Sequence, residues 1–286
     1  MSQATLRVAC VQMNTRDDVA ANVRSAARLI DQAAAAGARV IALPETWAFK
    51  GRSAGIRASA EPVDGPSNSA VAALAARHGV FILAGSLYEP SVEPGRVYNT
   101  SALFGPDGGL RAVYRKIHLF DVVAGATLYR ESDDVTAGTE LVTATIEAGA
   151  AGSAGAAAPP ATLGLTICYD LRFPELYRSL ALRGAQVLMV PSAFTSFTGA
   201  AHWEVLLRAR AVENGCFVVA PGQVGEHLPG RSCFGHSMIV DPWGTVLAVL
   251  EEGEGLCVAD LDFAHLDQIR AQIPPLANRR PEAYEL

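Results

Sequence analysis

The sequence has few cysteines and no paired cysteine motif. Five cysteines are spread over 286 residues, and no two of them form a CxxC pair. An odd number of widely spaced cysteines does not build a disulfide framework, and it favours free thiols in a reducing compartment. The cysteine pattern therefore predicts a cytoplasmic protein.

Long apolar runs and clusters of basic residues are also missing. The first residues, MSQATLRVACVQMN, lack the apolar core of a signal peptide, and no apolar run is long enough to span a bilayer. The net charge is −6, and the basic residues are scattered. These absences argue against a membrane or a nucleic acid as a partner. The motifs GxxxxGK and GxGxxG follow no predicted strand, which argues against a nucleotide-binding α/β protein.

What the sequence does contain is a duplicated plan. Hydrophobic residues make up 50% of the chain, enough for a substantial core. Four segments recur in the same order: TLRVACVQ (5–12) as TLGLTICY (162–169), GARVIALPE (37–45) as GAQVLMVPS (184–192), AARHGVFILAG (75–85) as AVENGCFVVAP (211–221), and SALFGPDGGLRAV (101–113) as SMIVDPWGTVLAV (237–249). We interpret this as an internal duplication of a strand–helix–strand–helix–strand–turn–strand unit.

The unit predicts mainly parallel strands joined by helices, with a hairpin at its end. In the first half we expect strands at 5–12, 39–45, 80–88, 99–104 and 110–116, helices at 22–36 and 69–78, and a loop at 50–66. Strands that are apolar throughout need cover on both faces of their sheet. One helical layer per half covers one face and the other half covers the second, which predicts an α/β fold built as a four-layer α-β-β-α sandwich with a pseudo-twofold axis.

The segment 147–162, EAGAAGSAGAAAPPAT, interrupts the plan. Its Ala, Gly and Pro content is typical of a linker, so a boundary between two domains is one interpretation. We favour a mobile hairpin insertion in a single domain, 1–275, because the duplicated halves need each other's faces. A short helix is expected at 264–273. The proline-rich tail at 276–286 is a candidate for contact with a partner subunit.

A cysteine occurs at a predicted strand-to-helix turn in the second half. The apolar run 163–167 predicts a buried strand that ends at Cys168, and Pro174 with Glu175 is typical of a first helical turn. Free backbone N–H groups and the helix dipole at such a turn favour the reactive thiolate. A nucleophile and a buried structural cysteine both remain open on this stretch alone.

Two charged residues follow predicted strands in the first half. Glu45 closes the strand 39–45, and Lys116 closes the strand 110–116. The carboxyl ends of parallel strands share one edge, where α/β proteins place their sites. Ser192 occupies the position in the second half that Glu45 holds in the first, so a carboxylate is not a structural requirement there. A strand-end salt bridge for Glu45 and a solvated edge position for Lys116 are the alternatives.

Three motifs around these residues resemble the signatures of the nitrilase, or carbon–nitrogen hydrolase, superfamily. They are LPET around Glu45, YRKIHLFD around Lys116 and TICYDLRFPE around Cys168. The resemblance runs from about residue 5 to 275, with the motifs in the family's order. It implies an α-β-β-α sandwich with internal pseudosymmetry, in agreement with the layer argument. It also implies a homodimer, or a higher oligomer, formed by continuing the sandwich.

The resemblance implies a role for each motif. Cys168 would attack an amide carbonyl carbon, with Glu45 as general base and then acid, and the resulting thioester would be hydrolysed by water. Lys116 and the Tyr169 N–H would stabilise the tetrahedral intermediate, and no metal or organic cofactor would be required. One carboxylate can serve both proton transfers in turn. Glu131, in YRESDDVTAG, matches a further acidic position of the family; a solvated acidic loop, together with the neighbouring aspartates, is the alternative.

Motifs in the second half of the sequence indicate which branch of the superfamily it resembles. Its segments PSAFTSFTGAAHWEVLLRARAVEN (191–214), GHSMIVDPWG (235–244) and NRRPEAY (278–284) resemble the Nit branch of the superfamily. That resemblance implies cleavage of deaminated glutathione to 2-oxoglutarate and cysteinylglycine, or ω-amidase activity on 2-oxoglutaramate. Both substrates are small amides with an α-keto carboxylate. Arg172 is the candidate to bind this carboxylate in a bidentate fork, and an ion pair with Glu175 or Asp170 is the alternative.

Other side chains receive lesser roles. Phe194 and Thr195 are expected to line the substrate pocket, and Arg208 and Arg210 to bridge subunits or layers. His118 is interpreted as structural, because a catalytic histidine must meet the nucleophile.

The remaining cysteines and histidines are expected to be structural. Cys10, Cys216 and Cys257 lie in apolar runs and are predicted to be core residues, whereas the glycine-flanked position of Cys233 favours exposure. His202 and His236 lack ligand-like spacing, so no zinc site is expected.

The motifs also bear on the alternatives to a Nit-type amidase. A papain-like peptidase needs its own cysteine signature, which CYDLRFPE is not. A catalytically silent binding module predicts the loss of Glu45, Lys116 or Cys168, and all three are present. Within the superfamily, true nitrilase and N-carbamoyl hydrolase activities remain possible.

Overall fold

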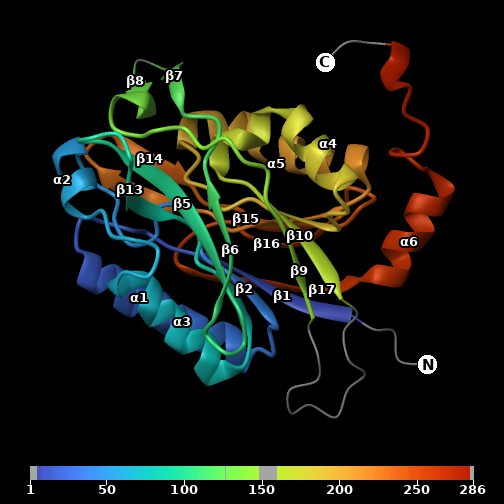
Figure 1. The fold of residues 1–286 in the computed structure, drawn as a ribbon, viewed down its shortest axis with the longest axis horizontal. Helices are drawn as coiled ribbons and strands as arrows, with labels where there is room; N and C mark the ends of the chain where they lie inside the picture. Colours follow the sequence, from blue (N-terminus) through green and yellow to red (C-terminus); the bar gives the residue numbers. More distant parts are fainter. Residues whose placement is uncertain (1–4, 126, 148–159, 284–286) are drawn as a thin grey trace.

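Two β-sheets stacked face to face form the centre of the molecule. The computed structural model describes residues 5–125, 127–147 and 160–283. Figure 1 shows the sheets between two helical layers, with α1 and α3 outside one sheet and α4 and α5 outside the other. The expected four-layer α-β-β-α sandwich is therefore confirmed.

The first sheet is built from the N-terminal half and one C-terminal strand. Its strands are β1 (Thr5–Gln12), β2 (Val40–Ala42), β3 (Phe81–Leu83), β4 (Leu87–Pro90), β5 (Val97–Phe104), β6 (Leu110–Arg115) and β17 (Gly255–Asp262). β1, β2 and β3 run parallel, while β5 is antiparallel to β3 and forms a hairpin with β6. β17 returns from the second half and pairs antiparallel with β1, so the two halves are joined at this edge.

The second sheet repeats this plan. Its strands are β9 (Thr143–Ile146), β10 (Ala161–Leu165), β11 (Val187–Met189), β12 (Phe217–Ala220), β15 (Ser237–Val240) and β16 (Val246–Leu250). β10, β11 and β12 are parallel, and β15 is antiparallel to β12 and to β16. This order matches β1, β2, β3, β5 and β6 one by one, which confirms the duplication.

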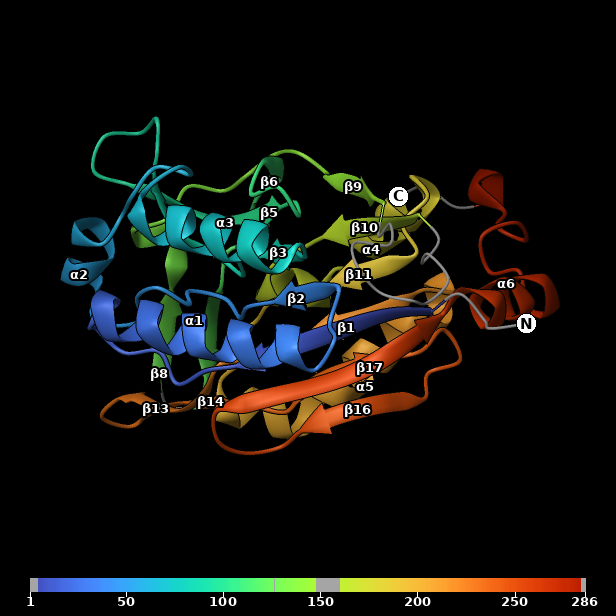
Figure 2. The same cartoon turned by 90° about the horizontal axis from the view of Figure 1, so that it is seen from below.

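Helices cover the outer face of each sheet. α1 (Val19–Ala35) and α3 (Pro66–His78) lie over the first sheet, as Figure 2 shows from their side. α4 (Pro174–Leu182) and α5 (Ser196–Asn214) cover the second, and α6 (Phe263–Gln272) follows β17. A core cluster contains Val8 from β1 together with Val219 and Ile239, which are paired on the inner face of the second sheet. Burial of these inner faces stabilises the stack because apolar area leaves water.

Three segments differ from expectation. The loop expected at 50–66 contains the short helix α2 (Ser53–Ala58). The strand expected at 80–88 is divided into β3 and β4 at Gly85, which has a φ of 41° and lies against the backbone of Pro44, where a Cβ would clash. The sequence analysis also predicts no strands after Lys116 in the first half, whereas an antiparallel hairpin of β7 (Asp121–Ala124) and β8 (Thr127–Arg130) follows it. Local propensity did not reveal these features because tertiary contacts determine them.

The low-complexity segment connects two paired strands. β9 and β10, which flank this segment, are antiparallel, with Ile146 opposite Ala161. The expected hairpin insertion between them lies outside the described residues. Residues 148–159 lie outside the described part of the chain, and so do 284–286 of the C-terminal tail. No helix within the described residues is long and apolar enough to cross a membrane. The single-domain assignment and the tail's contact with a partner subunit stay predictions.

Candidate active site

Cys168 lies at a sharp turn between β10 and α4. It begins a short 3-10 helix, Cys168–Arg172, and α4 starts at Pro174 as expected. The backbone φ of Cys168 is 50°, a left-handed conformation that non-glycine residues rarely adopt. A hydrogen bond of 2.9 Å from Cys168 N to Pro191 O holds the turn. The turn thereby fixes the direction of the thiol.

Glu45 is held on the turn after β2. Ala193 N donates to Glu45 Oε2 at 2.9 Å, and the Gln223 side chain donates to the Glu45 backbone carbonyl at 2.9 Å. The next residue, Thr46, has a φ of 54°, and its N–H donates to Ser86 Oγ at 3.0 Å. Both halves of the duplication therefore orient this carboxylate.

Lys116 lies between two carboxylates. Its Nζ is 2.8 Å from Glu45 Oε1 and 2.8 Å from Glu131 Oε2, and only 2% of the lysine is exposed. The alternative of a solvated edge lysine is therefore wrong. Glu45 does form a salt bridge at the end of its strand, as the alternative interpretation proposed. The partner of Glu45 in this salt bridge is the buried Lys116, within the site.

Asn99 connects the two carboxylates, and the sequence analysis missed it. Its Nδ2 donates to Glu45 Oε1 at 3.0 Å and to Glu131 Oε1 at 3.1 Å, from the middle of β5. The buried Oδ1 of Asn99 has no hydrogen-bond partner among the described residues. Glu131 also accepts the N–H of Phe120 at 2.7 Å, so it is a fixed part of the cluster rather than a solvated loop residue. Asn99 carries no sequence signal, since an asparagine in a strand is unremarkable.

The charges of the cluster favour one protonation state. Burial by itself would raise the pKa of Glu45, but the positive charges of Lys116 and Lys50 lower it overall. Burial would lower the pKa of Lys116, but Glu131 and Glu45 hold it well above its usual value. Burial, and then the negative charge of Glu45, raise the pKa of the Cys168 thiol well above its usual value. The resting site therefore contains a carboxylate, an ammonium and a neutral thiol.

This state contradicts the expectation of a resting thiolate at Cys168. The helix terminus was expected to favour the anion, but a buried sulfur next to an ionised carboxylate favours the thiol. Glu45 lines the same cavity as Cys168 and raises the pKa of its thiol, so a proton acceptor is available next to the sulfur. Activation by proton transfer replaces activation by a lowered pKa.

A cavity of about 780 Å³ opens over these residues. Glu45, Lys116 and Cys168 line it, together with three of the expected pocket residues, Tyr169, Phe194 and Thr195. Two residues of the β7–β8 hairpin, Leu128 and Tyr129, also border it. Its volume is typical of a small-molecule site.

Arg172 does not line the cavity. Its guanidinium lies 5.8 Å from the ring centroid of Tyr169 and 5.4 Å from that of Phe194, behind two rings that do line it. Its Nη2 is 3.3 Å from His202 Nδ1. The alternative ion pairs with Glu175 or Asp170 do not occur among the described residues. A role for Arg172 in substrate binding stays a prediction.

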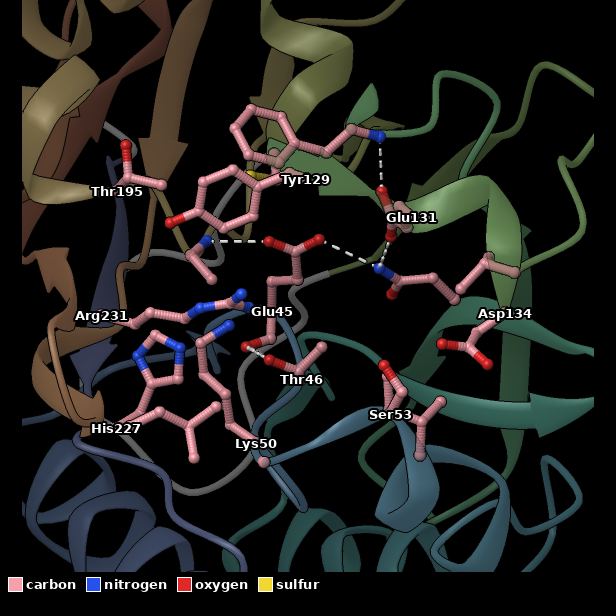
Figure 3. A pocket seen from close by; sticks show the side chains of 18 of the residues that line it. Glu45, Thr46, Lys50, Ser53, Tyr129, Glu131, Asp134, Thr195, His227 and Arg231 are labelled. Carbon is pink, nitrogen blue, oxygen red and sulfur yellow. Dashed lines mark hydrogen bonds between the residues drawn. The ribbon is translucent and has the colours of Figure 1, made fainter. Parts of the chain in front are cut away.

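The cavity is also lined by basic residues that the sequence analysis did not select: Lys50, Arg52, Arg130, His227 and Arg231. Figure 3 shows Lys50, His227 and Arg231 on one side of Glu45, with Glu131 and Asp134 on the other. His227 and Arg231 belong to the hairpin of β13 (Val224–Leu228) and β14 (Arg231–Phe234). They lie far from the motifs in sequence, so no spacing pattern connected them with Glu45.

A second polar cluster supports the nucleophile turn. Asp170, fully buried, accepts hydrogen bonds from Tyr114 Oη at 2.6 Å, Ile167 N at 2.8 Å and His118 N at 3.0 Å, and its Oδ1 is 2.7 Å from His118 Nδ1. The His118 ring also stacks on Phe173 at 3.6 Å. These contacts are consistent with a structural role for His118.

Two other expectations concern the second half. Cys233, expected to be exposed, is buried on β14 with 5% of its surface exposed, because the hairpin packs it toward the cavity. The buried Arg210 donates to Leu171 O at 3.0 Å and joins α5 to the nucleophile turn. Arg208 donates to Gly244 O at 2.8 Å, which links α5 to the turn before β16. Both arginines connect elements of one subunit.

Comparisons with known proteins agree with this geometry. The family model described as "Carbon-nitrogen hydrolase" matches residues 7–271. The deaminated glutathione amidase of Synechocystis sp. is 42% identical over 280 residues, which cover 95% of this chain and 97% of that protein. Omega-amidase NIT2 of Mus musculus is 36% identical over 282 residues, which cover 98% of this chain and 97% of that protein.

A solved structure shows the same similarity in three dimensions. The crystal structure of the Caenorhabditis elegans NitFhit protein superposes with a TM-score of 0.85 and 36% sequence identity, covering 100% of this chain and 67% of that one. A family match over nearly the whole chain and a shared fold lead to one conclusion. The chain belongs to the carbon–nitrogen hydrolase family of the nitrilase superfamily, and it is a hydrolase that acts on C–N bonds.

Proposed function

We propose that the protein hydrolyses the amide bond of deaminated glutathione, yielding 2-oxoglutarate and cysteinylglycine. The observation that carries the proposal is the buried cluster of Glu45, Lys116 and Cys168 in one cavity. The similarity to proteins named deaminated glutathione amidase supports the choice of substrate. A cavity of about 780 Å³ also offers room for a substrate of tripeptide size.

The acylation step begins with proton transfer from Cys168 to Glu45. The sulfur then attacks the amide carbon, and the carbonyl oxygen becomes an oxyanion. The Lys116 ammonium and the Tyr169 N–H, which belongs to the first turn of the 3-10 helix and has no partner within it, stabilise that oxyanion. Glu45 returns the proton to the leaving nitrogen, the C–N bond breaks, and a thioester of Cys168 remains.

Deacylation uses the same groups in reverse. Glu45, again a carboxylate, takes a proton from a water molecule that attacks the thioester carbon. Collapse of the second tetrahedral intermediate breaks the C–S bond, and Glu45 returns the proton to the sulfur. The carboxylate product leaves, and the neutral thiol of the resting state is restored.

A second substrate, 2-oxoglutaramate, is the specific alternative. The similarity to Omega-amidase NIT2 favours it, and its acyl group is the same 2-oxoglutaryl group. The two substrates differ only in the leaving group, which is ammonia for one and a dipeptide for the other. The acylation chemistry is therefore common to both.

A substrate panel on the purified protein tests the proposal. Deaminated glutathione, 2-oxoglutaramate, simple amides, a nitrile and an N-carbamoyl compound are compared by kcat/KM, with ammonia and peptide products identified by mass spectrometry. Deaminated glutathione is expected to have the highest kcat/KM. Turnover no faster than that of simple amides would contradict the assignment. Intact mass should show an acyl adduct on the native protein and none on Cys168→Ala.

We further propose a cytoplasmic homodimer. All five cysteines are free thiols, which is typical of a reducing compartment. Exposed Val205 and Val212 on α5 and Trp243 before β16 line one apolar groove on the outside of the second sheet. Burial of such a patch between two copies would remove apolar area from water.

A further inference from the structure

Two cations on one wall of the cavity have no carboxylate partner. Lys50, in the loop after β2, and Arg231, at the start of β14, both line the cavity. Neither forms an ion pair with any residue that the structure describes. Lys116, by contrast, is neutralised by two carboxylates. Lys50 and Arg231 are therefore charged groups that have no ion-pair partner within the described part of the chain.

The two cations act on the same neighbour. Burial, and then the positive charges of Lys50 and Arg231, lower the pKa of His227 to about 3. His227 is therefore a neutral imidazole at pH 7. Figure 3 shows the three side chains directed toward the same part of the cavity, beside Glu45. They form a group with two positive charges and a neutral ring that can donate or accept a hydrogen bond.

The wall is held in place before any ligand binds. The Arg231 guanidinium lies over the Tyr129 ring, 5.3 Å from its centroid. Phe234 N donates to Phe194 O at 2.9 Å, and Ser232 Oγ is 2.8 Å from Ser196 Oγ, so the β13–β14 hairpin is attached to the start of α5. Like charges fixed side by side repel each other, and a bound anion removes that repulsion. Fixed positions also reduce the ordering cost of binding.

We propose that Lys50 and Arg231 bind the carboxylate of the substrate's leaving group, a short peptide with a free C-terminus. This inference rests on the proposed amidase function. The acyl group stays bonded to Cys168, which is buried, whereas the leaving nitrogen must face Glu45 to receive its proton. Lys50 acts electrostatically on Glu45, and Arg231 is exposed at the cavity rim, where the leaving group exits.

The subsite would separate two classes of amide. Cysteinylglycine ends in a carboxylate and can engage both cations, because the Arg guanidinium and the Lys ammonium each prefer carboxylate oxygens. The ammonia released from 2-oxoglutaramate carries no such group. Lys50 and Arg231 would therefore be specificity-determining residues for peptide amides.

The test compares deaminated glutathione with its C-terminal glycinamide, which contains the same scissile bond and lacks only the charge. We would measure kcat/KM for the wild type, Lys50→Met and Arg231→Met, and the Kd of both compounds in a Cys168→Ala background. The loss caused by each substitution should be about 10- to 100-fold larger for the free acid than for the amide. The ratio of the loss on the free acid to the loss on the amide removes any effect of a Lys50 substitution on Glu45 or on folding, because both substrates share that effect.

Two further variants sharpen the result. Arg231→Lys keeps the charge and should retain most of the preference for the free acid. Arg24→Gln, which removes an exposed cation from α1, should leave the preference unchanged. Equal losses on acid and amide would overturn the subsite, even where the wild type hydrolyses deaminated glutathione efficiently. If the wild type failed to hydrolyse deaminated glutathione, the proposed function would be contradicted. If Cys168→Ala still bound the free acid more tightly than the amide, the subsite would be supported all the same.

Discussion

The side-chain amide of Asn99 donates a hydrogen bond of 3.0 Å to Glu45 Oε1. The same nitrogen is 3.1 Å from Glu131 Oε1, so one neutral donor separates two carboxylates. Lys116 contacts the same two groups from its own position. Asn99 therefore positions the Glu45 carboxylate, the proposed general base, without adding a charge to the cluster.

Replacing Asn99 by Asp should shift the pH dependence of catalysis. A third carboxylate next to Glu45 opposes its ionisation and raises its pKa, because like charges disfavour the ionised form. We expect the acid limb of the kcat/KM profile to move to higher pH in Asn99→Asp, with an activity loss of about 10- to 100-fold. Asn99→Ala should lose activity without this shift. Identical profiles for the two variants would show a purely structural role.

Glu131→Gln tests the second carboxylate at Lys116. The substitution keeps the shape but removes one of the two charges that hold the ammonium. A hydrogen bond to a charged group contributes about 1.5–3 kcal/mol, so kcat should fall about 10- to 100-fold. Steady-state kinetics on a variant with an unchanged circular dichroism spectrum measures this. Retention of wild-type kcat would mean that Glu45 alone positions Lys116.

The pH profile of the wild type should be flat across the neutral range. The pKa of Glu45 is lowered from 4.5, and that of Cys168 is raised well above 9.0, so base and nucleophile keep their working forms between these values. The lowered pKa of Glu45 in the folded state also stabilises the fold above pH 4.5, and this contribution is lost as the pH falls through the lower value. Measurement of kcat/KM at constant ionic strength checks the profile. A limb near neutral pH would contradict the assigned protonation states.

Asp170→Ala should reduce stability. Asp170 is fully buried and accepts hydrogen bonds from Tyr114 and from the backbone of Ile167 and His118, which lose their partner in the variant. Breaking such a buried polar network costs about 3–5 kcal/mol of unfolding free energy. Denaturant unfolding should show a lower midpoint at similar slope. The control, exposed Asp133→Ala, is expected within about 0.5 kcal/mol of the wild type.

Trp243→Glu tests the proposed dimer surface. Trp243 is 56% exposed next to Val205 and Val212, and a charge there would have to be desolvated on association. Sedimentation velocity should show a dimer for the wild type and a shift toward monomer for the variant. The matched control is Val92→Glu, on the turn between β4 and β5, which should leave the dimer intact. A monomeric wild type would refute the proposal.

Periodicity and repetition in the sequence were sufficient to predict the layers. β1 spans Thr5–Gln12 as expected, and the four repeated segments form equivalent elements of the two sheets. Apolar strands alternating with helices permit few arrangements, since both faces of each sheet must be buried. The sequence also predicted that Glu45, Lys116 and Cys168 lie together, because local motifs carry them, and the three residues line one cavity.

Only the tertiary structure decided which other side chains join them and in which charge state. Asn99 and Arg231 come from a strand and a hairpin that are far from Glu45 in the chain. Lys50 follows Glu45 closely in sequence, but only the folded loop brings its side chain to the cavity. The protonation of Cys168 was mispredicted for the same reason. A helix terminus is visible in the sequence, whereas the burial of the sulfur and the charge of Glu45 beside it exist only after the two sheets have packed together.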